Sequence, residues 1–183
     1  RDRTPQQNLI AAQSIRSFTS RSVVDGSFEA NAAGWNASGN YQVAGSSIPA
    51  TNGTNVLVFN GSQAVPNGVA SQAIPTVPGQ TYRLDFDMGA YGVTGNNQIL
   101  EITVLGNSTL LSRTETIPGI GAGTTNWSSK SYEFVADGSS VTITFRDVSA
   151  PTTDIDLVLD DIRLNAGGTA VLTHNLIHGN AVD

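Results

Sequence analysis

Three carboxylates in this sequence lie directly beside large apolar residues. Glu29 follows Phe28, and Asp160 and Asp161 follow Leu159. Taking a carboxylate out of water is costly unless it is paired, and a hard cation such as Ca²⁺ binds through several oxygen ligands. These carboxylates are therefore candidate metal ligands. Solvated acids at a sheet edge are the alternative.

Groups with the spacing of a catalytic site are scarce. His174 and His178 are the only histidines, and their segment lacks the glutamate of the zinc-protease motif. Asp85 and Asp87 could serve glycoside hydrolysis if their carboxylates lay about 5 to 10 Å apart. The alternation of charged and apolar residues in their segment is, however, also typical of the solvent face of an antiparallel sheet. With no cysteine and no nucleophile-elbow motif, we predict a protein that is not an enzyme.

A polar sheet face is the predicted binding surface. Charged residues alternate with apolar ones on several expected strands, so they should share the polar side of one sheet. Planar charged groups hydrogen-bond well to sugar hydroxyls, and an ordinary hydrated face is the alternative. The predicted set is Arg83, Asp85, Asp87, Glu101, Glu133 and Arg146.

Exposed aromatic rings, which serve as platforms for sugar rings, are in short supply. Alternation turns most of the tyrosines and phenylalanines inward. Only Tyr41 and Tyr91, both near glycine-rich loops, are expected to be exposed and to contact a ligand. This shortage argues against tight polysaccharide binding.

The elements that must position these residues are expected to be short β-strands. Residues 81–88 alternate strictly, and glycine, proline and asparagine separate the successive runs, as in an antiparallel sandwich. Only residues 7–18 have helix-compatible spacing, and their serines and threonines disfavour a helix. The same period of two recurs in residues 99–105, 131–135, 141–146 and 156–164.

Charge is sparse and unevenly distributed. Only 13% of residues are charged, which is common in exported proteins and unlike a nucleic-acid binder. Residues 1–21 hold four arginines and one aspartate, which gives them a net charge of +3. The whole sequence has a net charge of −6, so residues 22–183 carry a net charge of −9. We predict a basic extension over residues 1–21, one domain over 22–165, and a β-prone tail over 166–183 that follows a hinge-like break at 166–168.

No run of apolar residues is long enough to span a membrane, and none has the form of a signal peptide. We therefore expect a secreted, extracellular or cell-surface protein without a membrane span, whose export signal has been removed.

Four segments together resemble the calcium-bearing jelly-roll carbohydrate-binding modules that accompany xylanases and glucanases, which are related to the galactose-binding-like superfamily. Residues 25–29 with Trp35 are similar to the family's N-G-x-F-E…W opening. The other segments are residues 52–57, residues 71–82 with their S-Q-x-I-x-x-x-P-G-x-x-Y pattern, and residues 159–164, which resemble the closing L-D-D-V-x-L strand.

The resemblance implies a jelly-roll β-sandwich and a structural Ca²⁺ site. It assigns Glu29 and Asp160 as side-chain ligands, with Asp161 as the alternative aspartate and carbonyls near Asn52 and Asn55 as further candidates. Strand parity favours Asp160, because it shares a face with Val158, Ile162 and Leu164, which are expected to point inward.

Two functions remain open from the sequence. The first is a non-catalytic carbohydrate-binding module that contacts a glycan surface. The second is a subunit of an extracellular filament, sheath or matrix, in which the terminal segments add as strands to other copies of the chain. The resemblance covers residues 22–165, so it favours the binding module.

Overall fold

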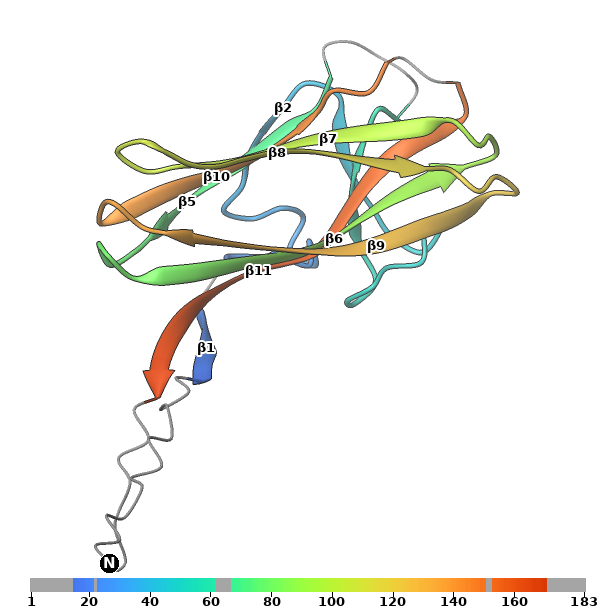
Figure 1. The fold of residues 1–183 in the computed structure, drawn as a ribbon. Coiled ribbons are helices and arrows are strands. Elements are labelled where there is room, and N and C mark those ends of the chain that lie inside the picture. The colour runs from blue at the N-terminus through green and yellow to red at the C-terminus, as the bar shows by residue number, and fades with distance from the viewer. Residues whose placement is uncertain (1–14, 22, 62–66, 151–152, 171–183) are drawn as a thin grey trace, which may run out of the picture.

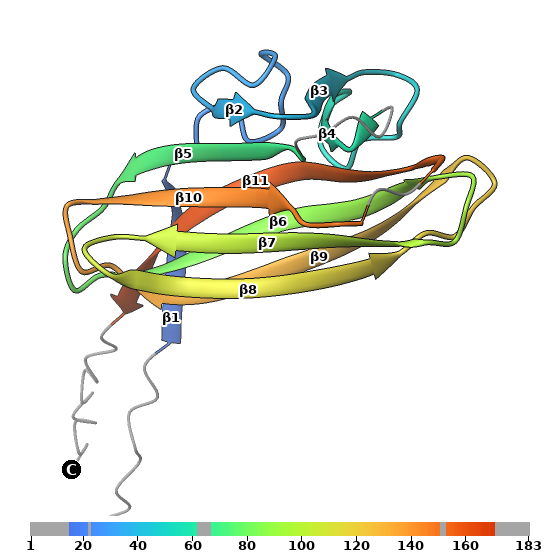
Figure 2. The same cartoon turned by 90° about the horizontal axis from the view of Figure 1, so that it is seen from above.

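The computed structural model describes residues 15–21, 23–61, 67–150 and 153–170. Over these residues the chain forms eleven β-strands in two stacked antiparallel sheets (Figures 1 and 2). The predicted all-β sandwich is therefore confirmed. The described residues include no helix that could cross a membrane.

The two sheets, named here A and B, take strands from distant parts of the chain. Sheet A has the order β3 (Tyr41–Ala44), β4 (Val56–Phe59), β11 (Ile155–Ala170), β6 (Thr81–Gly92), β9 (Thr124–Val135), and β1 (Ile15–Arg21) also pairs with β11. Sheet B has the order β2 (Asn36–Ser38), β5 (Val69–Pro75), β10 (Ser140–Asp147), β7 (Asn97–Leu105), β8 (Thr109–Pro118).

The main core lies between the sheets and follows the predicted alternation. On β6 the four apolar residues from Tyr82 to Met88 are buried and the charged residues between them are only partly buried. On β7 and β10 the alternate apolar residues are likewise buried. Phe86 of sheet A meets Phe145 of sheet B edge to face, with ring centroids 5.0 Å apart.

A second, smaller hydrophobic cluster lies on the outer face of sheet A. Val58 and Val158 point outward there and are fully buried, because Ile48 and the loop around it cover them. Trp127 closes the cluster by donating its Nε1–H to the Pro49 carbonyl at 3.1 Å. Tyr91 packs against the same cluster, so the expectation of an exposed ring is wrong for Tyr91; Tyr41, on β3, is 41% exposed.

A β-bulge in β11 corrects the parity argument for Asp160. The pairing of β11 with β6 shifts between Asp160 and Arg163, and Asp161 has a φ of 50°. The bulge moves the following residues to the other face. Val158 therefore packs in the outer cluster while Ile162 packs in the main core, so the four residues do not share one inward face.

The two ends of the described chain pair with each other. The break predicted at residues 166–168 is absent, since β11 continues through it to Ala170. Residues 15–21 form β1, which pairs antiparallel with residues 164–170 and projects from the body as a ribbon (Figures 1 and 2). The helix that the sequence disfavours over residues 7–18 is indeed absent over residues 15–18, which belong to β1. Residues 7–14, the tail beyond residue 170 and both histidines lie outside the described residues.

Candidate functional site

The segment of residues 25–29 is a tight turn fastened to β11. Asp25 accepts hydrogen bonds from the amides of Ala30 and Ala33 at 2.9 and 3.0 Å. Its own carbonyl accepts the indole N–H of Trp35 at 3.0 Å. The Gly26 carbonyl accepts the amide of Ile162 at 2.9 Å, which ties the turn to the strand that carries Asp160.

Glu29 leaves this turn and holds one end of the loop of residues 51–55. Its Oε1 accepts the amides of Thr54 and Asn55, both at 2.7 Å, and its Oε2 accepts the Thr54 hydroxyl at 2.9 Å. Bonds from the two amides favour the charged form and lower the pKa of Glu29. The carboxylate is solvent-accessible, so it does not lie in the main core.

Asp160 holds the other end of the same loop. Its Oδ2 accepts the amides of Thr51 and Asn52 at 2.7 and 2.8 Å and the Thr51 hydroxyl at 3.0 Å, and its Oδ1 accepts the amide of Asp161 at 2.7 Å. The side chain is fully buried. Burial raises the pKa of Asp160, and the hydrogen bonds oppose that rise.

Glu29, Asp160 and residues 51–55 together form what is called here the loop clip. Asp161 accepts the side-chain amide of Asn52 at 2.9 Å and pairs with exposed Arg163 at 3.1 Å. Asn55 donates its side-chain amide to the Phe28 carbonyl at 3.4 Å. The structure thus brings together all five residues of the predicted metal site.

The chemistry of the loop clip suits a hard cation, because its available ligands are all oxygens: carboxylates, amide oxygens and backbone carbonyls. No group of three or more His, Cys, Asp or Glu side chains is placed to hold a metal among the described residues. Carboxylates alone would therefore not complete a coordination shell, and carbonyl oxygens of the loop would have to contribute.

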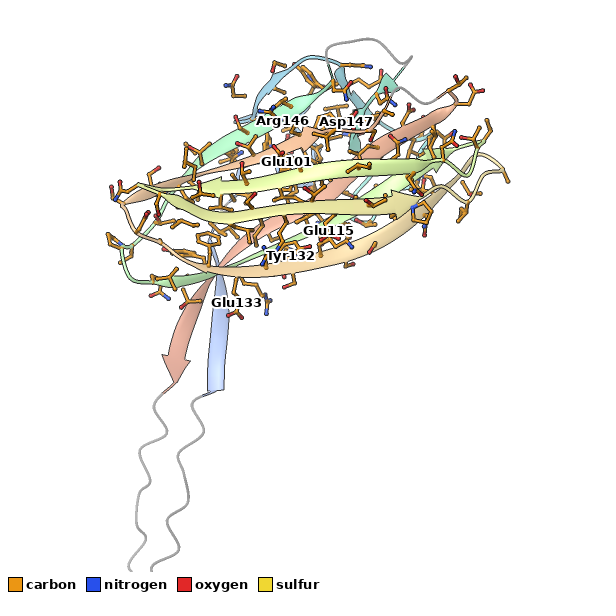
Figure 3. The ribbon with its side chains drawn as sticks, turned by 45° about the horizontal axis from the view of Figure 1, so that its top comes forward. Glu101, Glu115, Tyr132, Glu133, Arg146 and Asp147 are labelled. Atoms are coloured by element: carbon orange, nitrogen blue, oxygen red, sulfur yellow. The ribbon has the colours of Figure 1, made fainter. Side chains whose placement is uncertain are left out.

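The predicted single binding face is wrong, because its residues lie on opposite outer faces of the sandwich. Arg83, Asp85 and Asp87 are on β6 of sheet A, whereas Glu101 and Arg146 are on β7 and β10 of sheet B. Figure 3 shows Glu101 and Arg146 on neighbouring strands and Glu133 on the other sheet.

On sheet A the carboxylate of Asp85 is already hydrogen-bonded to neighbouring side chains. Asp85 accepts the Arg83 Nε–H at 2.9 Å, the Ser131 hydroxyl at 2.7 Å and the Asn165 amide at 2.7 Å. A ligand that used Asp85 would have to replace three existing hydrogen bonds.

On sheet B the outer face carries a row of hydroxyl groups that crosses the strands. Register places Thr144 of β10 opposite Ser71 of β5 and Thr103 of β7, and Thr103 opposite Ser112 of β8. All four side chains are partly or fully exposed. The row crosses four strands that lie about 4.8 Å apart.

Glu101 and Arg146 occupy the adjacent row of this face. They are cross-strand partners, with Arg146 Nε 3.7 Å from Glu101 Oε1, and their side chains are 41% and 55% exposed. An exposed pair at this distance contributes little to stability. The guanidinium and carboxylate therefore keep hydrogen-bonding capacity for a ligand.

Sequence reasoning missed a polar bridge between the edge strands of the two sheets. Glu115 of β8 accepts the Tyr132 hydroxyl at 2.5 Å and pairs with Lys130 of β9 at 2.8 Å (Figure 3). Lys130 and Tyr132 lower the pKa of Glu115, and burial beside Glu115 raises the pKa of Tyr132. The bridge links two sheets, and no periodicity along one strand could have revealed it.

A second missed group is acidic and lies where β10 ends and β11 begins. Asp147 is 2% exposed and its Oδ2 has no hydrogen-bond partner. Burial raises the pKa of Asp147. Burial and the charges of Asp147 and Asp154 raise the pKa of Asp156 to about 6.

We expect Asp156→Asn to stabilise the protein increasingly as pH rises from 3.8 to about 6, with the full gain above that pH. Because its pKa is raised, the Asp156 carboxyl is protonated more readily in the folded state than in the unfolded state. Its contribution to stability is therefore full below the ordinary pKa of 3.8 and is lost as pH rises through about 6. The neutral amide avoids that loss. After allowance for solvent screening, the gain is about 1 kcal/mol. Urea unfolding across this pH range measures it, and an equal gain at pH 3.8 would contradict the explanation.

Comparison with known proteins agrees with this architecture. A family model described as a carbohydrate binding domain matches residues 20–152. No curated protein sequence matches the chain.

Three solved structures are similar in fold. The structure of TmCBM61 in complex with β-1,4-galactotriose has a TM-score of 0.57 and 18% identity and covers 79% of this chain and 98% of its own. A family 16 carbohydrate-binding module has a TM-score of 0.54 and 19% identity, with 78% and 97% covered. A CBM4 structure has a TM-score of 0.52 and 16% identity, with 79% and 99% covered.

Proposed function

Because the chain belongs to the carbohydrate binding domain family, whose modules are non-catalytic, we propose that it binds a glycan through the outer face of sheet B. One observation carries this choice of face. The outer face of sheet A is occupied by the hydrophobic cluster, its covering loop and the Asp85 network, whereas sheet B presents its hydroxyl row and the Glu101–Arg146 pair to solvent.

The chemistry of this face favours a hydrated glycan chain held by hydrogen bonds. None of the five strands of sheet B presents an aromatic side chain outward. Stacking on rings therefore contributes little on these strands, and threonine, serine and the charged pair supply donors and acceptors. Such a site suits a soluble or loosely packed glycan at a secreted or cell-surface location.

Arg146→Ala is expected to weaken glycan binding about tenfold to a hundredfold, because a hydrogen bond to a charged group is worth about 1.5 to 3 kcal/mol. A glycan array identifies a ligand, and isothermal titration calorimetry then compares the variants. Arg83→Ala is the matched control, since Arg83 lies on the opposite face. If Arg83→Ala weakened glycan binding and Arg146→Ala did not, the glycan site would lie on sheet A and not on sheet B.

A structural Ca²⁺ at the loop clip is the second part of the proposal. Glu29 and Asp160 would hold the ion, with oxygens near Asn52 and Asn55, and the ion would offset the charge of the two carboxylates. Saturation at about 100 times the dissociation constant adds about 2.7 kcal/mol to stability. We expect a chelator to lower Tm and Glu29→Gln to abolish that difference. A Tm that the chelator leaves unchanged would count against the ion.

Assembly with other copies of the chain is a second candidate function, and the ribbon favours it. Among the described strands, β1 pairs only with β11, and residues 167–170 pair only with β1. A projecting two-stranded ribbon is marginally stable alone and leaves strand edges open to pairing. A filament, sheath or matrix subunit could use these edges.

Proline at Ser17 or Thr19 tests assembly, because each substitution removes a backbone N–H from β1. Analytical ultracentrifugation should show oligomers of the unmodified chain that these variants lose. A chain that is monomeric at all concentrations, or variants that assemble unchanged, would exclude this use of the ribbon.

A further inference from the structure

Asparagine followed by glycine can modify itself. The glycine amide nitrogen attacks the side-chain carbonyl carbon of asparagine, the C–N bond to the side-chain nitrogen breaks, and ammonia leaves. Water then opens the cyclic imide to aspartate or isoaspartate. No side chain on glycine hinders the attack. The described residues contain three such pairs: Asn52-Gly53, Asn60-Gly61 and Asn67-Gly68.

Two of these pairs are held in place by the fold. Asn60 is 3% exposed and its side-chain amide donates to the Ile155 carbonyl at 3.4 Å. The side-chain amide of Asn67 donates to the carbonyls of Asp147 and Ser149 at 3.2 and 3.1 Å. The following Gly68 is buried against the Phe59 ring. Either pair would have to open locally before it could cyclise.

The third pair lies in the loop clip at the surface. The Asn52 side-chain amide also donates a hydrogen bond, to Asp161 at 2.9 Å, but this bond is exposed to solvent. Asn52 and Gly53 are both exposed to water. The amides of Asn52 and Thr54 are bonded to Asp160 and Glu29, but the amide of Gly53 between them makes no hydrogen bond to the described residues. The nucleophile is therefore unengaged and accessible to water.

We infer that Asn52 is a site of spontaneous deamidation in the native protein. The reaction replaces the side-chain amide that bonds to Asp161 with a carboxylate or, in isoaspartate, moves the carboxylate and lengthens the backbone. Both products remove a donor and add a negative charge beside Asp160 and Asp161. Isoaspartate also changes the spacing between the amides that Asp160 holds and those that Glu29 holds, so it loosens the loop clip.

Mass spectrometry of the full chain aged in mildly alkaline buffer tests this inference. Chymotrypsin cuts after Phe59, so Asn52 falls in a different peptide from Asn60 and Asn67. Asn55, which precedes Val56 in the same loop, is an internal control. In the native protein we expect Asn52 to convert at least about tenfold faster than Asn60 or Asn67, since each 1.4 kcal/mol of opening free energy slows a reaction of the opened state about tenfold.

In urea the three pairs should convert at comparable rates, because the fold no longer protects two of them. Aged native protein should lose thermal stability in step with conversion, and Asn52→Gln should abolish that loss. Equal native rates at the three pairs, or slower conversion at Asn52, would overturn the inference. So would conversion at Asn52 with no isoaspartate and no change in stability.

Discussion

Asp160→Ala is expected to lower the free energy of unfolding by about 3 to 5 kcal/mol, because among the described residues it removes the one buried side-chain acceptor that joins β11 to the 51–55 loop. The carboxylate accepts four hydrogen bonds, three of them from Thr51 and Asn52. Without it, these donors lose their acceptor, and the removed carboxylate leaves a gap where the Asp160 side chain was fully buried. Chemical denaturation monitored by tryptophan fluorescence measures the loss.

Asp161→Ala is the matched control for this substitution. Asp161 is adjacent in sequence, but it makes only one side-chain hydrogen bond, to Asn52, and one ion pair with a half-exposed arginine. Its loss should cost no more than about 1 kcal/mol. Equal effects of the two substitutions would mean that the burial of Asp160 does not decide the stability of the loop clip.

Gly26→Ala is expected to destabilise by about 3 kcal/mol, because a Cβ at this position would overlap the backbone carbonyl of Ile162. That carbonyl belongs to β11 and cannot move without breaking the pairing of the strand. The shift would also strain the bond from the Ile162 amide to the Gly26 carbonyl. Thermal unfolding should show a much lower Tm.

Gly79→Ala is the control for Gly26→Ala. It measures the cost of placing alanine at a positive φ where no steric clash occurs. Gly79 has a φ of 78°, and a Cβ there would meet nothing within 4 Å. Its substitution should cost only the left-handed penalty of about 1 to 2 kcal/mol. If Gly79→Ala proved as damaging as Gly26→Ala, close approach to β11 would not be the reason for glycine in the opening segment.

Local pattern was enough to predict which residues of a strand point inward. Successive side chains of a strand alternate by covalent geometry, so the buried face of β6 and the polar position of Asp85 could be read from the chain. The positions of Glu29 and Asp160 beside apolar residues marked both as candidate ligands, but they could be paired with each other only through the resemblance of two short segments to a family. Their spacing along the chain carries no information on contact.

Local pattern could not assign strands to sheets. Strands β6 and β7 follow each other in sequence and both alternate, yet β6 pairs with β11 and β9 while β7 pairs with β10 and β8. Alternation defines an inner and an outer side for each strand but not the sheet whose outer side it joins. For this reason the residues predicted to share one face lie on two: Asp85 and its partners are on sheet A, and the Glu101–Arg146 pair is on sheet B.

The sequence by itself determined the all-β class, the inward faces of the main strands and the family, because each depends on residue order over short distances. Only the tertiary structure decided which outer face is open, that Tyr91 is covered, and that β1 and the end of β11 form one ribbon. These depend on long-range pairing and on a bulge at Asp160, where the register of one strand is set by its neighbour.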